Sequence, residues 1–303
     1  MNTPSLRGYF AIALTPFNEA GDLLWDELAA EFDWIVRAGG HGIVWPVNNS
    51  EQMVLSASER MRGYQVMTEV VAGRIPTVAG VADTSKAGAI ELAEAAARAG
   101  ADATIAVPPW SVKMSDPALI RDFYRDVAEA GGVPHFIQNL GGQMGSNLSS
   151  RFVAELCAAI PLVQYVKEER DPHGTWVSEL IGLNSPDVLG VFTGGHRLGM
   201  VASHERGAVG CIASADMTDI CAQIWERMET GDIQGARRIQ DAWAVLQWAM
   251  GDIPYLADLK EVMVRRGVFS SNSRRSLGPY ALDPWHASEM EHGLEVLSAY
   301  FRV

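Results

Sequence analysis

Short apolar segments alternate with longer amphipathic segments along most of the chain. The apolar segments predict strands, and each is apolar throughout rather than alternating, as expected for strands buried on both faces of a parallel sheet. Successive segments begin roughly 20–35 residues apart, which is the spacing of βα units. The predicted strands are residues 9–14, 42–45, 75–81, 103–107, 135–138, 163–168, 188–193 and 208–212.

The amphipathic segments between these strands predict helices. In the first of them, Leu28, Phe32 and Ile35 share one face, and the second opens with Ser56 and Glu59, which have the spacing of a capping box. The other predicted helices are residues 85–100, 117–130, 150–159, 175–183, 198–206 and 219–230. This repeat favours a (β/α)8 TIM barrel over an open doubly wound sheet.

The end of the chain continues with helical patterns alone, at residues 233–250, 256–266 and 286–301. This stretch is too short for a separate sheet domain. We therefore predict a catalytic barrel over residues 1–230 and a C-terminal helical segment over residues 231–303 that packs on the barrel. In TIM barrels the chemistry takes place at the C-terminal ends of the strands, so the polar residues at those ends are the candidates.

Composition narrows the class of protein. The chain has 303 residues, of which 48% are hydrophobic, and no apolar run reaches the ~18–20 residues of a membrane span. Its start lacks the pattern of a signal peptide, which predicts a cytoplasmic protein. A net charge of −13 argues against nucleic acid and anionic membranes as partners. The three cysteines have no ligand-like spacing, and with no HExxH motif we expect no metal site.

Lysines are few enough to consider one by one. Of the 24 basic residues only four are lysines, namely Lys86, Lys113, Lys167 and Lys260. Lys167 ends the sixth predicted strand, where loss of solvation can lower the pKa of an amine and free it as a nucleophile for a Schiff base. The alternative is a lysine whose ammonium group reaches solvent beside the strand end. The other three lie in predicted loops or helices, where solvated ammonium groups are ordinary.

Several short motifs, in order, resemble one family. They are Ala-Leu-Thr-Pro-Phe at residues 13–17, Glu51 with Leu55-Ser56 and Glu59-Arg60, Lys167-Glu168, Gly194, and Gly-Ala-Val-Gly at residues 207–210. Together they resemble the dihydrodipicolinate synthase/N-acetylneuraminate lyase family of class I aldolase-type barrels. The resemblance implies that Lys167 is the Schiff-base lysine, that the substrate is a small 2-oxo acid, that no cofactor is needed, and that the protein is a homotetramer.

Other positions depart from that family. Where its loop after strand two reads Gly-Thr-Thr-Gly-Glu, this chain has Asn48, Asn49 and Ser50 before its glutamate. Backbone donors and the Ser50 hydroxyl could still bind a carboxylate, although such a stretch is also ordinary turn chemistry. Gln138 stands where the family has a catalytic tyrosine. Trp110 replaces the aromatic that reaches across subunits, and Gln143 replaces an arginine that binds a second carboxylate. Dihydrodipicolinate synthesis is therefore not expected.

The same replacements resemble one subset, the L-2-keto-3-deoxyarabonate dehydratases. This resemblance implies dehydration of a 2-keto-3-deoxy sugar acid through a Lys167 imine, with Gln138 orienting substrate or water, and with Gly194 and Ile212 bordering the substrate. The general base stays open among Glu168, Glu169, a bound water and the substrate carboxylate. Because strand residues alternate faces, Glu169 is expected on the Lys167 side and Glu168 on the opposite side.

Three other interpretations stay open: a pyruvate-dependent aldolase of the same family, a metal-dependent barrel lyase that uses carboxylate ligands, and a non-catalytic barrel that only binds a 2-oxo acid. After strand seven, Gly194, Gly195 and His196 could cradle an anion, although a plain turn is the simpler interpretation.

Overall fold

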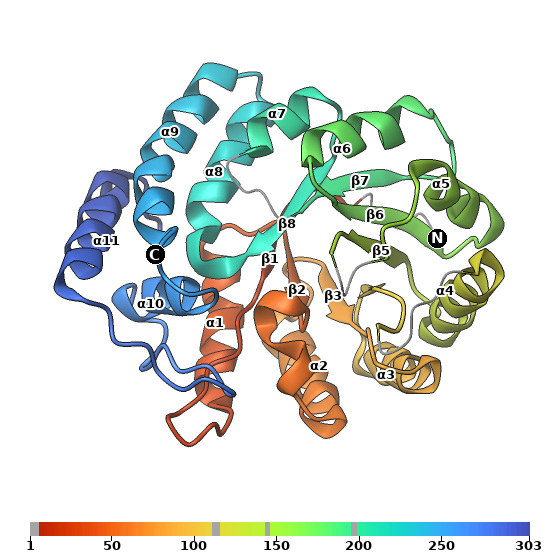
Figure 1. Ribbon diagram of the computed structural model, residues 1–303, viewed down its shortest axis with the longest axis horizontal. Helices are drawn as coiled ribbons and strands as arrows, with labels where there is room; N and C mark the ends of the chain where they lie inside the picture. The colour runs from red at the N-terminus through yellow and green to blue at the C-terminus, as the bar shows by residue number, and fades with distance from the viewer. Residues whose placement is uncertain (1–5, 111–115, 143–145, 195–198) are drawn as a thin grey trace.

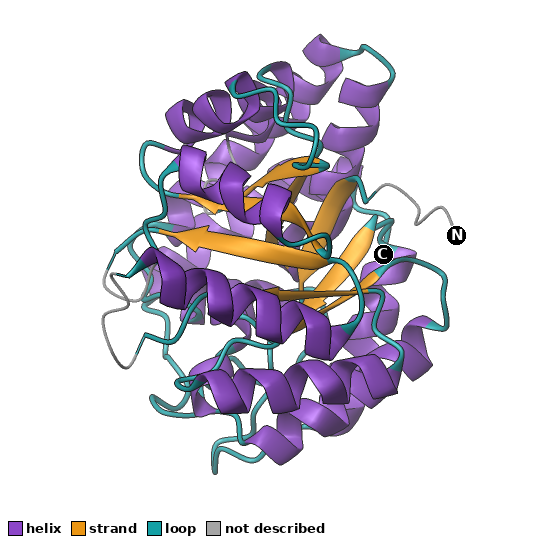
Figure 2. Cartoon of the chain, turned by 90° about the vertical axis from the view of Figure 1, so that its right-hand side faces the viewer, coloured by secondary structure: helices purple, strands orange, loops and turns teal. Residues whose placement is uncertain are grey.

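The protein is a closed barrel of eight parallel strands surrounded by helices (Figures 1 and 2). Its computed structural model describes residues 6–110, 116–142, 146–194 and 199–303. The strands pair in chain order, and β1 closes the barrel by pairing with β8. The prediction of a (β/α)8 TIM barrel with C-terminal helices is confirmed.

The elements lie close to the predicted ranges. The strands are β1 Gly8–Ile12, β2 Gly42–Trp45, β3 Thr77–Gly80, β4 Ala103–Ala106, β5 His135–Leu140, β6 Val163–Glu169, β7 Gly190–Thr193 and β8 Gly210–Ser214. The helices are α1 Trp25–Arg37, α2 Ala57–Val71, α3 Lys86–Ala99, α4 Pro117–Gly131, α5 Ser150–Ala159, α6 His173–Gly182, α7 Met200–Glu205, α8 Thr218–Glu229, α9 Ile233–Met250, α10 Ala257–Arg265 and α11 Pro284–Leu297.

Strands β5 and β6 run further than predicted, and this extension positions the site. They stay paired to Leu140 and Glu169, and Gln138 lies opposite Lys167 in the register. Because the strand continues through Glu169, the alternation of faces also continues, so Lys167 and Glu169 share the inner face while Glu168 faces outward.

Aromatic rings fill the interior of the barrel. Phe136 stacks on Tyr165 with ring centroids 4.9 Å apart, and Phe192 lies 5.1 Å from Phe10. A Cβ atom on Gly210 would overlap the Phe192 ring, so only glycine lets β8 approach this layer. Tyr165 precedes Lys167 by two residues on the same face of β6. The aromatic layer therefore closes the barrel just below the amine.

The C-terminal helices pack against one side of the barrel. Helix α9 packs on α8, α11 packs on α9, and α10 lies against the short 3-10 helix η4 (Ala215–Met217) that follows β8 (Figure 1). Helix α10 thus lies near the C-terminal end of β8, where the barrel opens. Cys157, Cys211 and Cys221 are all buried. Within the described residues, no helix is both long enough and apolar enough to cross a membrane.

Candidate active site

A cavity of about 300 Å³ opens at the C-terminal ends of the strands. Its walls come from the ends of strands β1, β5, β6 and β8, from the loop that follows β2, and from the C-terminal helical segment. The lining residues are Ile12, Val47, Asn48, Asn49, Leu140, Lys167, Glu169, Ile212, Ala213, Ser214, Tyr255, Asp258 and Leu259. Four residues predicted for the site (Asn48, Asn49, Lys167 and Ile212) are therefore brought together on one cavity.

Lys167 is buried in the cavity wall, with 2% of its surface exposed. Its Nζ lies 3.0 Å from Glu169 Oε1, as the alternation of strand faces predicts. Gly194 packs directly against this pair, because a Cβ atom there would lie 2.8 Å from Lys167 Cε and still closer to Glu169 Cγ. Gly194 thus leaves space for the ion pair, although it is not itself a lining residue of the cavity.

Gln138 acts on the cavity through Glu169. It is 1% exposed, and its Nε2 donates a hydrogen bond of 2.6 Å to Glu169 Oε2. One carboxylate oxygen therefore faces the lysine and the other faces the amide. Gln138 is not among the lining residues of the cavity, and its contact with the cavity passes through Glu169. Its Oε1 is buried and accepts no hydrogen bond from the described residues.

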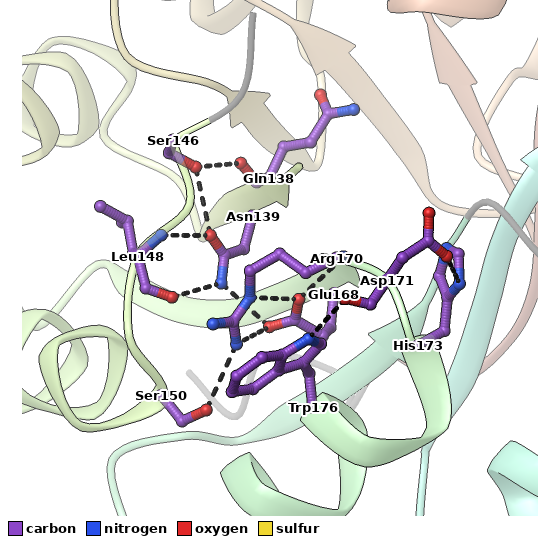
Figure 3. Close-up of polar contacts among 10 residues, drawn as sticks. All are labelled: Gln138, Asn139, Ser146, Leu148, Ser150, Glu168, Arg170, Asp171, His173 and Trp176. Carbon is purple, nitrogen blue, oxygen red and sulfur yellow. Dashed lines mark hydrogen bonds and ion pairs between the residues drawn. The ribbon is translucent and has the colours of Figure 1, made fainter. Parts of the chain in front are cut away.

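Glu168 belongs to a separate polar cluster on the outside of the barrel (Figure 3). It is fully buried and accepts hydrogen bonds from Arg170 Nε at 2.8 Å and from Asn139 Nδ2 at 2.9 Å. Asn139 in turn donates to the backbone oxygen of Leu148, and the Arg170 guanidinium stacks over Trp176. Because these partners hold Glu168 away from Lys167, Glu169 is the carboxylate that geometry offers as a base.

The loop after β2 presents two of its three predicted binding residues. Asn48 and Asn49 line the cavity, and the Asn48 amide oxygen accepts from Gln52 Nε2 at 2.8 Å, which leaves its NH2 group as a donor. Ser50 is fully buried, and its hydroxyl donates to the Ala13 backbone oxygen. In this structure the Ser50 hydroxyl thus ties the loop to the residue that follows β1, and its contact with a carboxylate stays a prediction.

The C-terminal helical segment contributes residues that the sequence did not indicate. Tyr255, Asp258 and Leu259 line the cavity, and the Tyr255 hydroxyl donates a hydrogen bond of 2.6 Å to Asn49 Oδ1. A helical pattern shows which face of α10 is apolar, but it does not show that the end of the helix faces the barrel mouth. No sequence signal identified these side chains.

Lys260 is not solvated, so that expectation is wrong. Its side chain is fully buried, and its Nζ donates to Glu51 Oε1 and to the backbone oxygen of Ser273. Burial lowers the pKa of Lys260 below its ordinary value, and Glu51 acts in the opposite direction. The sequence held a signal here, because Lys260 lies on the same helical face as Leu256 and Met263.

Some predicted positions lie elsewhere. Gln143, Gly195 and His196 fall outside the described residues, as does Lys113. Trp110 is half-buried and packs against the hydrophobic core. Within the part of the chain that the structure describes, no group of three or more His, Cys, Asp or Glu side chains could hold a metal ion.

A buried lysine paired with a glutamate at the mouth of a TIM barrel fits a barrel enzyme that forms a Schiff base with its substrate. The chain matches the dihydrodipicolinate synthetase family over residues 5–291 and belongs to that family. Members of the family are lyases that use a lysine Schiff base, and this chain is an enzyme of that kind.

Individual relatives agree with this assignment. The 4-hydroxy-tetrahydrodipicolinate synthase of Rhizobium meliloti (strain 1021) is 29% identical over 300 residues, covering 95% of this chain and 97% of the relative. The synthase of the same name from Thermodesulfovibrio yellowstonii is 31% identical over 248 residues, covering 80% of this chain and 82% of the relative. The crystal structure of YagE from E. coli K12, a prophage protein of the dihydrodipicolinic acid synthase family in complex with pyruvate, has a TM-score of 0.88 at 20% identity, covering 96% and 98%.

Proposed function

We propose that the enzyme dehydrates a five- or six-carbon 2-keto-3-deoxy sugar acid, of the L-2-keto-3-deoxyarabonate type, through a Schiff base at Lys167. One observation carries this proposal. A single carboxylate, Glu169, bridges Lys167 Nζ at 3.0 Å and Gln138 Nε2 at 2.6 Å at the C-terminal ends of β6 and β5. The proposed base therefore lies beside the proposed nucleophile and is held there by an amide.

Glu169 can first prepare the amine. It accepts a proton from the Lys167 ammonium, and the neutral amine attacks the C2 carbonyl of the 2-oxo acid. The resulting carbinolamine loses its hydroxyl as water, taking the proton back from Glu169, and an iminium remains. The 3.0 Å separation of Nζ and Oε1 lies within the range for direct proton transfer.

Glu169 can then act on C3. The iminium withdraws electrons from C3, so the carboxylate removes a C3 proton and an enamine forms. The enamine expels the C4 hydroxyl, which leaves as water with the proton that Glu169 had taken. Hydrolysis of the unsaturated iminium returns the amine and releases an unsaturated product. This product tautomerises to a 2-oxo acid semialdehyde in the five-carbon case and to a 2,5-dioxo acid in the six-carbon case. Gln138 does not titrate usefully, so its part is to hold Glu169 in place.

The other cavity residues suit a 2-oxo acid. Amide and backbone donors at Asn48 and Asn49 lie where the substrate carboxylate would bind, and Ile12 and Ile212 form an apolar floor. We also propose the homotetramer that the resemblance implies, with Trp110 at an interface.

An aldolase is the second candidate, because curated relatives carry the name of a synthase. Cleavage of C3–C4 requires control of an alkoxide that develops on a departing aldehyde. In this family a tyrosine at position 138 would be the group for that task, and glutamine cannot relay a proton. Dehydration needs only the small leaving group that Glu169 can protonate, so we favour it.

Product analysis separates the two activities. The enzyme is incubated with 2-keto-3-deoxy acids of five and six carbons, and the products are identified by mass and by semicarbazone absorbance. We expect a 2-oxo acid semialdehyde as the main product from a five-carbon acid and a 2,5-dioxo acid from a six-carbon acid. Pyruvate with an aldehyde would show an aldolase instead, and binding without turnover would show a barrel that only binds 2-oxo acids.

A further inference from the structure

The C-terminal helical segment touches the loop at residues 48–51 at two separate points. At the cavity, the Tyr255 hydroxyl donates to Asn49 Oδ1 at 2.6 Å. Deeper in the protein, Lys260 donates to Glu51, whose second oxygen accepts from the backbone N–H of Arg275 at 3.1 Å. The partners of each contact are more than 200 residues apart in the chain.

The deeper contact is buried, and Lys260 has several partners that hold it there. Lys260 is 0% exposed, donates also to the Ser273 backbone oxygen at 2.7 Å, and lies 4.7 Å from the centre of the Phe17 ring. Glu51 sits in the left-handed region at φ 56°, between the two 3-10 turns of the loop. A non-glycine residue stays in this region only where surrounding contacts fix it, and Lys260 supplies such a contact.

The contact at the cavity is aimed by the backbone of the C-terminal segment. Leu256, which follows Tyr255 and precedes α10, also has a positive φ of 69° and is buried. Its buried side chain fixes the direction of the chain at Tyr255, which is 61% exposed at the mouth of the cavity. The Tyr255 ring therefore reaches Asn49 from a fixed backbone.

We infer that Tyr255 and Lys260 are positioning residues, which hold Asn49 and Glu51 so that the loop is set to receive the carboxylate of the 2-oxo acid. The inference rests on the proposed function, in which this loop binds that carboxylate. Lys260 fixes the base of the loop and Tyr255 orients the Asn49 side chain, whose oxygen is occupied by the phenol so that its NH2 group is left to donate. The C-terminal segment is thus part of the active site.

The decisive variant is Tyr255→Phe, which removes one hydroxyl from an exposed side chain and leaves the core untouched. Pyruvate is trapped on the enzyme with borohydride at increasing pyruvate concentrations, and the adduct is followed by intact mass. The half-saturating pyruvate concentration is expected to rise about 2- to 10-fold, the range for loss of one hydrogen bond. Trapping at saturation stays as in the wild type, because Lys167 is unchanged.

Tyr280→Phe is the matched control, since Tyr280 lies in the same segment and is not a lining residue of the cavity. A second variant, Glu51→Gln with Lys260→Met, removes the deeper ion pair without leaving a lone buried charge, and it should shift the half-saturating concentration in the same direction. An unchanged half-saturating pyruvate concentration in Tyr255→Phe would overturn this inference and leave the proposed function standing. A wild-type enzyme that traps no pyruvate at Lys167 would overturn the proposed function, and this inference with it.

Discussion

Lys167 and Lys260 are both removed from solvent and both paired with a glutamate, but their surroundings differ. Lys167 lies on the cavity, and among the described residues its ion-pair partner is Glu169 at 3.0 Å. Lys260 is away from the cavity and is held by Glu51, by the Ser273 oxygen and by the Phe17 ring. Burial lowers the pKa of Lys260 below its ordinary value, and Glu51 acts in the opposite direction. We therefore expect a buried lysine to react only if its amine reaches the cavity and has few protein partners. Burial alone does not distinguish a reactive lysine from a structural one.

The largest expected effect comes from removing the reactive amine. Lys167→Ala should abolish the pyruvate adduct and lower turnover by at least about 10³-fold, because among the described residues Lys167 is the lysine that lines the cavity. Intact mass and peptide mapping after borohydride trapping measure the adduct. Lys86→Ala is the control, since Lys86 is about half exposed and pairs with Asp126 on the surface. A pyruvate adduct on Lys260 in the wild type would instead show that Lys260 is the reactive lysine.

Removing the structural lysine should act on stability instead. Lys260→Met leaves the Glu51 carboxylate buried without its cation, so the free energy of unfolding should fall by about 3–5 kcal/mol. Urea denaturation measures this value. The double variant with Glu51→Gln should recover most of the loss. Lys167→Met should cost less, because Glu169 borders a cavity that water can enter, and equal losses in the two lysine variants would remove the distinction.

The two neighbouring glutamates of β6 sharpen the comparison. Glu169→Gln should lower turnover by about 10²-fold, the lower range for loss of a general base, while pyruvate trapping falls less. Glu168→Gln should leave turnover nearly unchanged and lower the free energy of unfolding, since Glu168 pairs with the buried Arg170. Steady-state kinetics and urea denaturation of both variants test this contrast. Equal losses of turnover would place both carboxylates in the chemistry.

The smallest effect concerns a second ion pair of the C-terminal segment, between Arg275 and Glu59. The Arg275 hydrogen bond lowers the pKa of Glu59 from 4.5 to about 2. Because the folded pKa is lowered, this pair stabilises the fold above pH 4.5, and its contribution is lost as the pH falls towards 2. Glu59→Gln should therefore cost less than about 1 kcal/mol at pH 7 and almost nothing near pH 2, as measured by urea denaturation. A cost independent of pH would contradict this account.

Local patterns in the sequence predict the barrel, and they single out a lysine that the structure places on the cavity. Strands β1 to β8 follow from short apolar segments and the helices from their amphipathic patterns, and Lys167 stands out because it lies at the end of a buried strand. Strand alternation also predicts that Glu169 lies on the same face as Lys167, provided that β6 continues one residue beyond its predicted end. These are all properties of single elements and their immediate neighbours in the chain.

Contacts between distant segments could not be predicted in the same way. Tyr255 and Lys260 reach the loop after β2 because α10 packs near the end of β8, and no periodicity states where a trailing helix will pack. Ser50 looked like a ligand because its hydroxyl is a donor, but the structure uses that donor on Ala13. A side chain's type shows what it can bond, and only the fold shows with which partner.

The contacts from the C-terminal segment also determine when the enzyme is complete during its synthesis. The chain emerges from the ribosome from its N-terminus, so the strands of the barrel and Lys167 are available before residues 255–275 exist. Until Lys260 and Arg275 arrive, Glu51 has neither of its partners from this segment. A nascent chain that already carries Lys167 would thus hold the loop at residues 48–51 without these contacts, and we expect catalytic competence only after residues 255–275 have been made.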